Sequence, residues 1–326
     1  MMKVKLFSTR RQITRTRLLV LSTALSFMMM LCLAPAVCAQ DAPSGSPALA
    51  RVMVTAVASS GKEVPPLGRQ DVSVHEDKKP CQVADLTPMG SSSEKLQLAI
   101  LIDQSSTTRL GQQLKEISQF IDALPPDSSI AVAYAMNGTV MMPQTFTKDR
   151  AAVNKTLHLT SGPSAGNTAI YEALADLIKQ WPRNSIRREV LLISDGIDDT
   201  YGRQQTEPGQ NPSLERAIQL AQQESITVFS IFVGSGRATR NEFLNMNGQG
   251  SLADLTTSTG GSAFSQGTQT PISFRPFLDD LQEMLGQQYL LTFRPAPSRK
   301  PGYHDLKAAV EIPHVKLLAP TKIYLP

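Results

Sequence analysis

An apolar stretch that ends at a carboxylate constrains the fold of this chain more than any other feature. Residues 98–102 are Leu-Ala-Ile-Leu-Ile, Asp103 follows them directly, and hydroxyl side chains come at Ser105 and Thr107. A short, branched run of this kind is typical of a parallel strand that helices cover on both faces. A buried helix segment has a similar composition, but the polar break at Asp103 comes too early for a helix. Open α/β sheets bind ligands at the carboxyl ends of strands, so these oxygens are candidate ligands for a hard divalent cation.

Downstream of this strand, short apolar runs alternate with amphipathic stretches. This alternation predicts a doubly wound, mostly parallel α/β sheet with helices on both faces, over residues 94–288. Asn137 and Gly138 are expected to form the turn of a hairpin within it. We predict strands over residues 130–135, 139–142, 189–194 and 226–233, and helices over residues 110–124, 151–159, 169–181, 214–224, 251–259 and 276–287.

Strand-like segments of a different kind flank this region. Residues 51–90 and 289–326 contain short runs of alternating apolar and polar residues, separated by turn-forming residues, which is typical of antiparallel strands. We expect the two segments to pair with each other into one small β module beside the α/β domain. Residues 40–50 are rich in Pro, Gly and Ser and are predicted to form a flexible linker.

The beginning of the chain has the layout of a secretory signal. Residues 1–39 run from a basic stretch through an apolar segment to small residues before Ala39, where we expect cleavage. An uncleaved membrane anchor is the alternative, because the apolar segment is long for a signal. All six charged residues of the segment are basic, so the formal charge changes from +4 for the whole chain to −2 without it. The basic pI therefore does not indicate nucleic-acid binding, and we expect a periplasmic, cell-envelope or extracellular protein.

Cysteine and histidine show no pattern typical of a metal or redox site. Cys81 is the only cysteine after residue 39, so an exported chain has no internal disulfide, and we expect this thiol to be a packed small side chain. His75, His158, His304 and His314 are scattered along the sequence without metal-ligand spacing.

Five residues from three parts of the α/β region resemble the metal-ion-dependent adhesion site of von Willebrand factor A domains. That pattern is Asp-x-Ser-x-Ser, then a distant Thr, then a distant Asp. The matching residues here are Asp103, Ser105, Thr107, Thr168 and Asp195. Thr107 is the one departure from the pattern, and it keeps the hydroxyl group that the last Ser supplies.

The segment before the α/β region carries a second resemblance. Its runs Val54-Thr-Ala-Val, Asp71-Val-Ser-Val and Glu76-Asp-Lys are similar to the segment that precedes the A domain in a bacterial secreted group called VWFA-related. Together the two resemblances imply a von Willebrand factor A fold. They also imply an exported, non-enzymatic protein that adheres to or binds a partner protein.

The resemblance implies the chemistry of the site as well. The five residues would hold Mg²⁺ or Mn²⁺, with Ca²⁺ as a third candidate, and a carboxylate of the partner protein would fill an open coordination position. Loops over residues 161–167, 196–213 and 234–251 are expected at the same edge of the sheet, where they would select the partner. Asp198 and Asp199 are assigned to solvation or loop structure.

Three other interpretations fit parts of the pattern. Ser105, Thr107 and Thr168 are residue types that cap helices, and Asp195-Gly196 is also an ordinary turn sequence. Haloacid-dehalogenase-type phosphatases also use a strand-end Asp with Mg²⁺, but they carry a second Asp two residues later as general acid, where this chain has Ser105. The third interpretation is a structural module of the cell envelope with a degenerate metal site.

Overall fold

The structure is a computed structural model, and it describes residues 49–59, 62–91, 95–104, 110–159, 169–182, 187–198, 200–201, 207–234, 241–297 and 300–326. The expected signal over residues 1–39 and the expected loop over residues 161–167 lie outside this part of the chain. The same holds for the expected linker up to residue 48, whereas its last residue, Ala50, already begins a strand. Among the described residues, no helix combines the length and the apolarity needed to cross a membrane.

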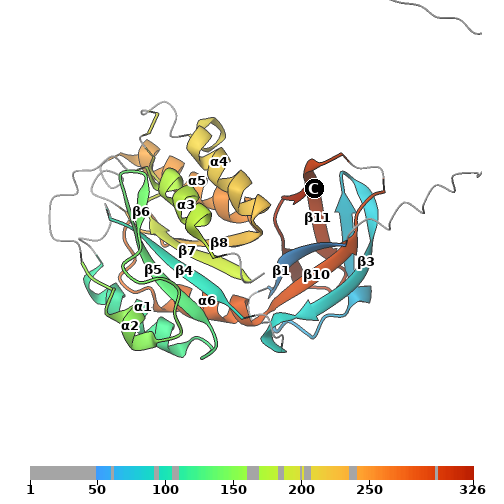
Figure 1. Ribbon diagram of the computed structural model, residues 1–326, viewed down its shortest axis with the longest axis horizontal. Helices are drawn as coiled ribbons and strands as arrows, with labels where there is room; N and C mark the ends of the chain where they lie inside the picture. Colours follow the sequence, from blue (N-terminus) through green and yellow to red (C-terminus); the bar gives the residue numbers. More distant parts are fainter. Residues whose placement is uncertain are drawn as a thin grey trace, which may run out of the picture. The chain divides into compact units, whose positions relative to one another are not determined.

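The α/β region forms a six-stranded sheet in the order β6-β5-β4-β7-β8-β9 (Figure 1). Its strands are β4 (Gln97–Asp103), β5 (Ser129–Met136), β6 (Thr139–Met141), β7 (Arg188–Ser194), β8 (Ile226–Phe232) and β9 (Ala263–Phe264). All neighbouring pairs are parallel except β5 and β6, which form the hairpin expected around Asn137 and Gly138. Both turn residues have positive φ, which suits the tight turn of a hairpin.

Helices cover both faces of this sheet, as Figure 1 shows. Along β4, Leu98, Ile100 and Ile102 pack in one hydrophobic core with α1, α2 and α6, while Ala99 and Leu101 pack in a second core with α3, α4 and α5. The prediction of a doubly wound, mostly parallel sheet is therefore confirmed. The helices are α1 (Gly111–Ala123), α2 (Arg150–Asn154), α3 (Ile170–Gln180), α4 (Pro212–Gln223), α5 (Glu242–Ser258) and α6 (Arg275–Gly286), with short 3-10 turns over Arg69–Asp71, Met89–Ser91 and Pro208–Gln210.

The strand order reverses direction at the centre of the sheet. From β4 the chain moves outward to β5 and β6, then returns through α3 to β7 on the other side of β4. The carboxyl ends of β4 and β7 therefore lie side by side at a topological switch point, which is where doubly wound sheets bind their ligands.

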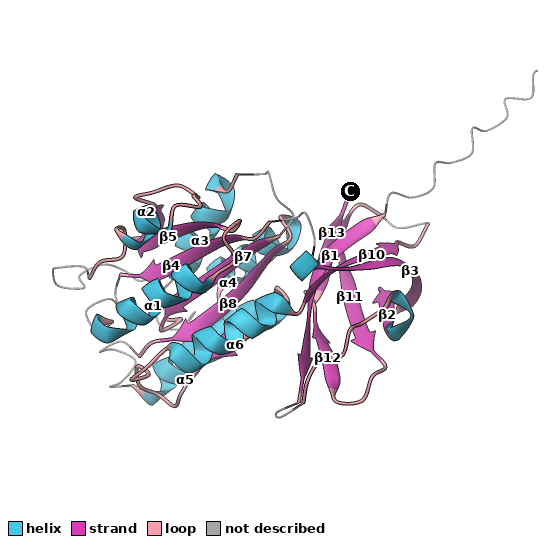
Figure 2. Cartoon of the chain, turned by 90° about the horizontal axis from the view of Figure 1, so that it is seen from below, coloured by secondary structure: helices cyan, strands magenta, loops and turns pink. Residues whose placement is uncertain are grey.

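The flanking segments form a second, antiparallel sheet in the order β12-β1-β10-β3-β2-β11-β13 (Figure 2). Its strands are β1 (Ala50–Ala58), β2 (Val72–Glu76), β3 (Lys79–Pro88), β10 (Gln288–Arg294), β11 (Gly302–Val310), β12 (Val315–Leu318) and β13 (Lys322–Leu325). Strands from before and after the α/β region are interleaved in this order, and they share one hydrophobic core. The predicted β module is confirmed.

One helix begins much earlier than the sequence indicated. The loop expected over residues 234–251 is wrong from Glu242 onward, because α5 starts there and the side chain of Asn241 caps it by accepting from Leu244 N at 3.2 Å. The first half of α5 contains two Gly and two Asn residues, which are poor helix formers, and its apolar residues show little helical periodicity.

A buried polar network joins the two sheets within the described part of the chain. Arg187, beside β7, donates from Nε to Oε1 of Gln288 at the start of β10 at 2.9 Å, and Gln288 Nε2 donates to Oε1 of Glu189 at 2.9 Å. All three side chains are buried. Burial raises the pKa of Glu189 to about 8, against the opposing effects of the Arg187 charge and the Gln288 hydrogen bond.

Candidate metal centre

Asp103 lies where the sequence placed it, at the carboxyl end of β4, and β7 fixes its side chain. The two strands are in register up to Ile102 and Ile193, so Ser194 of β7 stands beside Asp103. Ser194 Oγ donates to Asp103 Oδ2 at 2.8 Å, and the same hydroxyl accepts from Gly196 N at 3.0 Å. A hydroxyl from the neighbouring strand thereby orients the buried carboxylate, a contact that the sequence pattern does not reveal.

Asp195 follows β7 in a tight turn that α5 holds in place. Its Oδ1 accepts from Ile197 N at 2.9 Å, and Gly196 has a positive φ of 69°. Helix α5 approaches this turn so closely that a Cβ on Gly248 would overlap the carbonyl oxygen of Asp195. The glycine that weakens the helical signal of α5 is therefore the residue that lets this helix pack against the turn.

Asp198 is a third buried carboxylate at this edge, and of its two expected roles, solvation and loop structure, its contacts fit the second. It is 3% exposed, its Oδ1 accepts from Thr200 N at 2.8 Å, and its Oδ2 accepts from Tyr171 N in the first turn of α3 at 3.4 Å. Burial raises its pKa, against the hydrogen bonds that lower it. The assignment to loop structure agrees with these bonds, while Asp199 lies outside the described residues.

A buried phenol, that of Tyr171, packs under the turn that follows Asp195. Tyr171 donates from its hydroxyl to the Gly196 carbonyl at 2.8 Å. Its pKa is raised well above the usual value, first by burial and then by the negative charges of Asp198, Asp195 and Asp103. Asp103 and Asp195 are both buried at the ends of neighbouring strands, and a cation bound beside them would offset the cost of burying their negative charges. The metal-ligand atoms that these carboxylates offer are all oxygens, and oxygen ligands fit a hard divalent cation such as Mg²⁺ or Mn²⁺.

The hydroxyl residues of the expected site cannot be placed in the same way. Ser105, Thr107 and Thr168 lie outside the described residues, so their part in the site stays a prediction. The alternative that they cap helices stays open with them, and the N-cap positions of α1 and α3 are occupied by Leu110 and Ala169.

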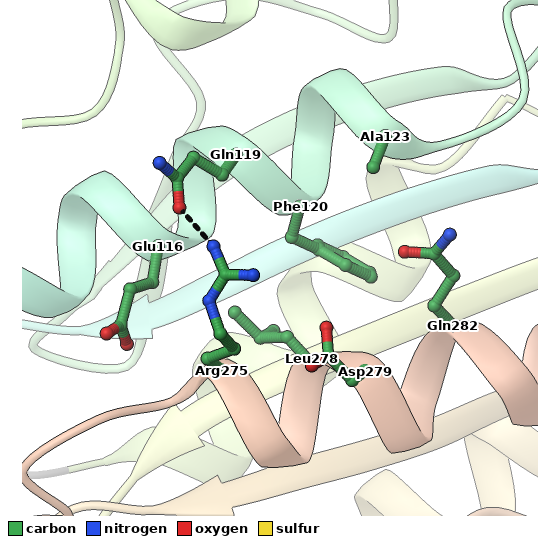
Figure 3. Close-up of a pocket in the computed structure, with 8 residues that line it drawn as sticks. All are labelled: Glu116, Gln119, Phe120, Ala123, Arg275, Leu278, Asp279 and Gln282. Atoms are coloured by element: carbon green, nitrogen blue, oxygen red, sulfur yellow. Dashed lines mark hydrogen bonds between the residues drawn. The ribbon is translucent and has the colours of Figure 1, made fainter.

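A pocket between α1 and α6 is a less convincing ligand site (Figure 3). Its polar groups bind one another: Arg275 Nη2 donates to Gln119 Oε1 at 2.8 Å, as the figure shows. Glu116 accepts from Ser273 Oγ at 2.8 Å and from Phe274 N at 2.5 Å, directly before α6. A carboxylate at a helix N-terminus is stabilising, so we interpret these residues as helix packing.

Comparisons with known proteins agree with the geometry of the α/β region. A family model described as the von Willebrand factor type A domain matches residues 97–260, about half of the chain, from the start of β4 to just after α5. No curated protein sequence matches.

Solved structures also match the chain, at low identity. An aerotolerance-related membrane protein from Bacteroides fragilis is 14% identical, with 58% of this chain and 98% of that chain covered and a TM-score of 0.43. The ArnB paralog VWA2 from Sulfolobus acidocaldarius is 12% identical, with 86% and 76% covered and a TM-score of 0.40. The VWA domain of SpRpn10 is 13% identical, with 59% and 97% covered and a TM-score of 0.39.

Proposed function

Because the chain belongs to the von Willebrand factor type A domain family, we propose that it is an exported, non-enzymatic protein that binds a partner protein through a divalent cation. Domains of this family mediate protein–protein interaction or adhesion. In this proposal Asp103 and Asp195 hold Mg²⁺ or Mn²⁺ together with the hydroxyls of Ser105, Thr107 and Thr168. A carboxylate of the partner completes the coordination.

The observation that carries the proposal is the arrangement of Asp103, Ser194 and Asp195. Their two strands are neighbours at the switch point of the sheet, and the Ser194 hydroxyl is hydrogen-bonded to Asp103. An ordinary turn after a strand would explain Asp195 alone. It would not explain why Asp103 is buried at the end of the neighbouring strand, or why the Ser194 hydroxyl holds the Asp103 carboxylate.

A small number of charged ligands suits a site that recognises an anion. When only one or two carboxylates bind the cation directly, the cation keeps a net positive charge and an open position. Neutral hydroxyl ligands, which Ser105, Thr107 and Thr168 would supply, leave that charge in place. The positive charge of the cation and its open coordination position both favour binding of a carboxylate from a partner.

Exposed apolar side chains near this edge support a protein as the partner. Phe243 and Met246 are 53% and 65% exposed, and they lie one turn apart at the start of α5. The same helix contacts the Asp195 turn through Gly248. Large apolar side chains beside a polar centre are typical of protein interfaces.

Export and the absence of catalysis rest on sequence features. Residues 1–39 have the layout of a secretory signal, and N-terminal sequencing of the purified protein would show whether cleavage follows Ala39. Ser105 stands where a phosphatase of the haloacid-dehalogenase type would have its general acid. Hydrolysis of para-nitrophenyl phosphate that is lost in Asp103→Ala would overturn the non-enzymatic assignment.

Calorimetric titration with Mn²⁺ and Mg²⁺ tests the metal site. We expect saturable binding by the protein, loss of binding in Asp103→Ala, and unchanged binding in Asp280→Ala, which removes an exposed carboxylate of α6. Thermal unfolding checks that each variant is folded, and Asp195→Asn replaces Asp103→Ala if the latter is not. Equal binding by the protein and its folded site variants, or no binding by the protein, would contradict the proposal.

A further inference from the structure

A second cluster of ionisable side chains lies in the antiparallel sheet, far from the first in sequence and in fold. Glu76 ends β2, Asp77 begins the β2–β3 turn, and His304 lies on β11. Asp77 N donates to the Asp305 carbonyl at 3.0 Å, and Asp305 N donates to Asp77 Oδ1 at 3.0 Å, so the turn is fixed to β11. Asp77 and Lys78 both have positive φ, a conformation that Asp tolerates.

The hydrogen bonds of His304 define which of its nitrogens carries a proton. Nε2 lies 2.7 Å from the carbonyl oxygen of Lys300, and a carbonyl only accepts, so Nε2 is the donor. The other ring nitrogen, Nδ1, faces two carboxylates. It lies 2.7 Å from Asp77 Oδ2 and 3.5 Å from Glu76 Oε1. In a neutral imidazole with its proton on Nε2, Nδ1 would carry a lone pair directed at these negative charges. The arrangement is stable only with a cation at Nδ1, either a proton or a metal ion.

The buried carboxylate of Glu76 independently indicates that a cation binds here. The residue is 1% exposed, and its Oε2 accepts from Ala296 N at 3.0 Å and from the Cys81 thiol at 3.8 Å. Its other oxygen, Oε1, is also buried, and no hydrogen-bond donor satisfies it within the described part of the chain. A buried carboxylate oxygen without a donor is costly. This oxygen faces His304 Nδ1.

We propose that Glu76, Asp77 and His304 form a binding site for a divalent transition metal of the Zn²⁺ class. One atom from each residue lies within 4.8 Å of the others. Ligand atoms around a tetrahedral zinc lie about 3.3 Å apart, given metal–ligand distances of about 2.0–2.2 Å, and the separation of Nδ1 and Oε1 is close to this. The Nε2–H bond to a backbone carbonyl is one of the contacts that orient metal-binding histidines.

The site has one open side. The Asp77 side chain is 50% exposed, whereas those of Glu76 and His304 are buried. Nδ1 and Asp77 Oδ2 are 2.7 Å apart, closer than two ligands of one zinc, so metal binding requires the exposed Asp77 carboxylate to rotate outward while its backbone stays bound to Asp305. Three protein ligands then leave a fourth position for water or an external group. An imidazole with two carboxylates favours Zn²⁺ over Mg²⁺, which prefers oxygen ligands alone. The inference uses none of the residues of the proposed adhesion site and does not depend on it.

Titration of the purified protein with Zn²⁺, and with Co²⁺ as a coloured probe, tests the site. We expect saturable Zn²⁺ binding with displacement of Co²⁺ absorption bands. Asp77→Asn and His304→Ala should each weaken this binding by at least about tenfold, since even outer-shell changes weaken metal sites by about 10–100-fold. His75→Ala is the matched control. His75 directly precedes Glu76 in β2, so its side chain points to the opposite face of the sheet. Asp103→Ala should keep the Zn²⁺ site.

Two results would overturn the proposal. One is the absence of saturable Zn²⁺ binding, which would mean that only a proton holds the cluster together. The other is equal binding by the protein and by Asp77→Asn. Asn tolerates the same left-handed backbone and keeps an oxygen for the Asp305 amide, so this variant should fold even if His304→Ala does not. The ¹⁵N chemical shift of His304 Nδ1 should change on Zn²⁺ addition, and an unchanged shift would contradict coordination there.

Discussion

The two acidic clusters of this protein differ in how the fold assembles them. At the edge of the parallel sheet, Asp103 ends β4 and Asp195 directly follows the adjacent strand β7, and the ligand atoms that they offer are oxygens. In the antiparallel sheet, Glu76 and Asp77 meet an imidazole that comes 227 residues later than Asp77. The first cluster suits a hard cation and the second a transition metal. Topology therefore sets where charged side chains meet, while the type of ligand atom sets which cation they suit.

The clusters also differ in how open they are. Asp103, Asp195 and Asp198 are all buried, so the site depends on a turn that α5 and β7 hold in place. In the second cluster Asp77 is half exposed and only the other two residues are buried. Changes in packing should therefore affect the first site strongly and the second site little.

The largest effect that we expect is on the junction between the two regions. Glu189 has a pKa of about 8 in the folded protein and an ordinary pKa near 4.5 when unfolded. Between these values the folded state binds more protons, so the free energy of unfolding should fall as pH rises, by about 3–5 kcal/mol in total. Above about pH 8 this contribution should be constant.

Urea unfolding over pH 4.5–9 measures this dependence, and Glu189→Gln isolates it. The difference in slope between the protein and the variant is the quantity of interest, since other groups titrate in both. A variant with the same slope as the protein would show that Glu189 is ionised at neutral pH in the junction. The two sheets would then be coupled by an ion pair with Arg187 rather than by a protonated carboxyl.

The next largest effect should come from Gly248→Ala. The new methyl group would meet the Asp195 carbonyl oxygen, which is backbone and cannot rotate away. We expect a loss of about 2–3 kcal/mol in stability and loss of Mn²⁺ binding, with Zn²⁺ binding kept. Gly250→Ala on the same helix is the control, because its methyl would meet only a side-chain carbon of Pro208 at 3.2 Å. Equal effects of the two changes on Mn²⁺ binding would contradict the role of Gly248.

Ser194→Ala should have a smaller effect that is confined to the parallel sheet. Ser194 acts as a positioning residue, since its hydroxyl holds the Asp103 carboxylate. Without it we expect Mn²⁺ to bind about 10–100-fold more weakly at calorimetry, with a folded protein. Ser230→Ala, in the neighbouring strand β8, removes a buried hydroxyl that has no hydrogen-bond partner among the described residues, and it should leave Mn²⁺ binding unchanged. Unchanged affinity in Ser194→Ala would mean that Asp103 is oriented by other contacts.

The smallest effect concerns the metal-free second cluster. The hydrogen bond to Asp77 is the main cause of the raised pKa of His304. This raised pKa stabilises the fold at low pH, and the stabilisation is lost as pH rises through the folded-state value. Asp77→Asn should lower the pKa of His304 in an NMR titration of the metal-free protein. If the pKa stayed the same, Glu76 rather than Asp77 would hold the imidazolium.

Much of the parallel sheet could be predicted from sequence because its signals are local. The apolar run before Asp103 and the similar run before Asp195 each indicate a buried strand and its end. Helix α5 was missed in its first half because Gly248 satisfies a tertiary contact at the expense of helical propensity. A contact of this kind leaves no periodic signal in the sequence.

The site residues that the sequence missed are those whose roles depend on strand register. Ser194 was placed within a strand, but only its pairing beside Asp103 makes it a ligand-orienting residue. Asp198 was assigned to solvation or loop structure, because nothing local in the sequence shows that α3 covers it. His304 was one of four scattered histidines, and only the pairing of β2 with β11 brings it to Glu76 and Asp77.

One titration series tests most directly whether the protein has two separate metal sites of different chemistry. Mn²⁺ and Zn²⁺ would each be titrated into the protein, Asp103→Ala and Asp77→Asn, with thermal unfolding to confirm that all three are folded. We predict that Asp103→Ala loses Mn²⁺ binding and keeps Zn²⁺ binding, and that Asp77→Asn does the reverse. Loss of both metals in one variant, or of neither in both variants, would contradict the account.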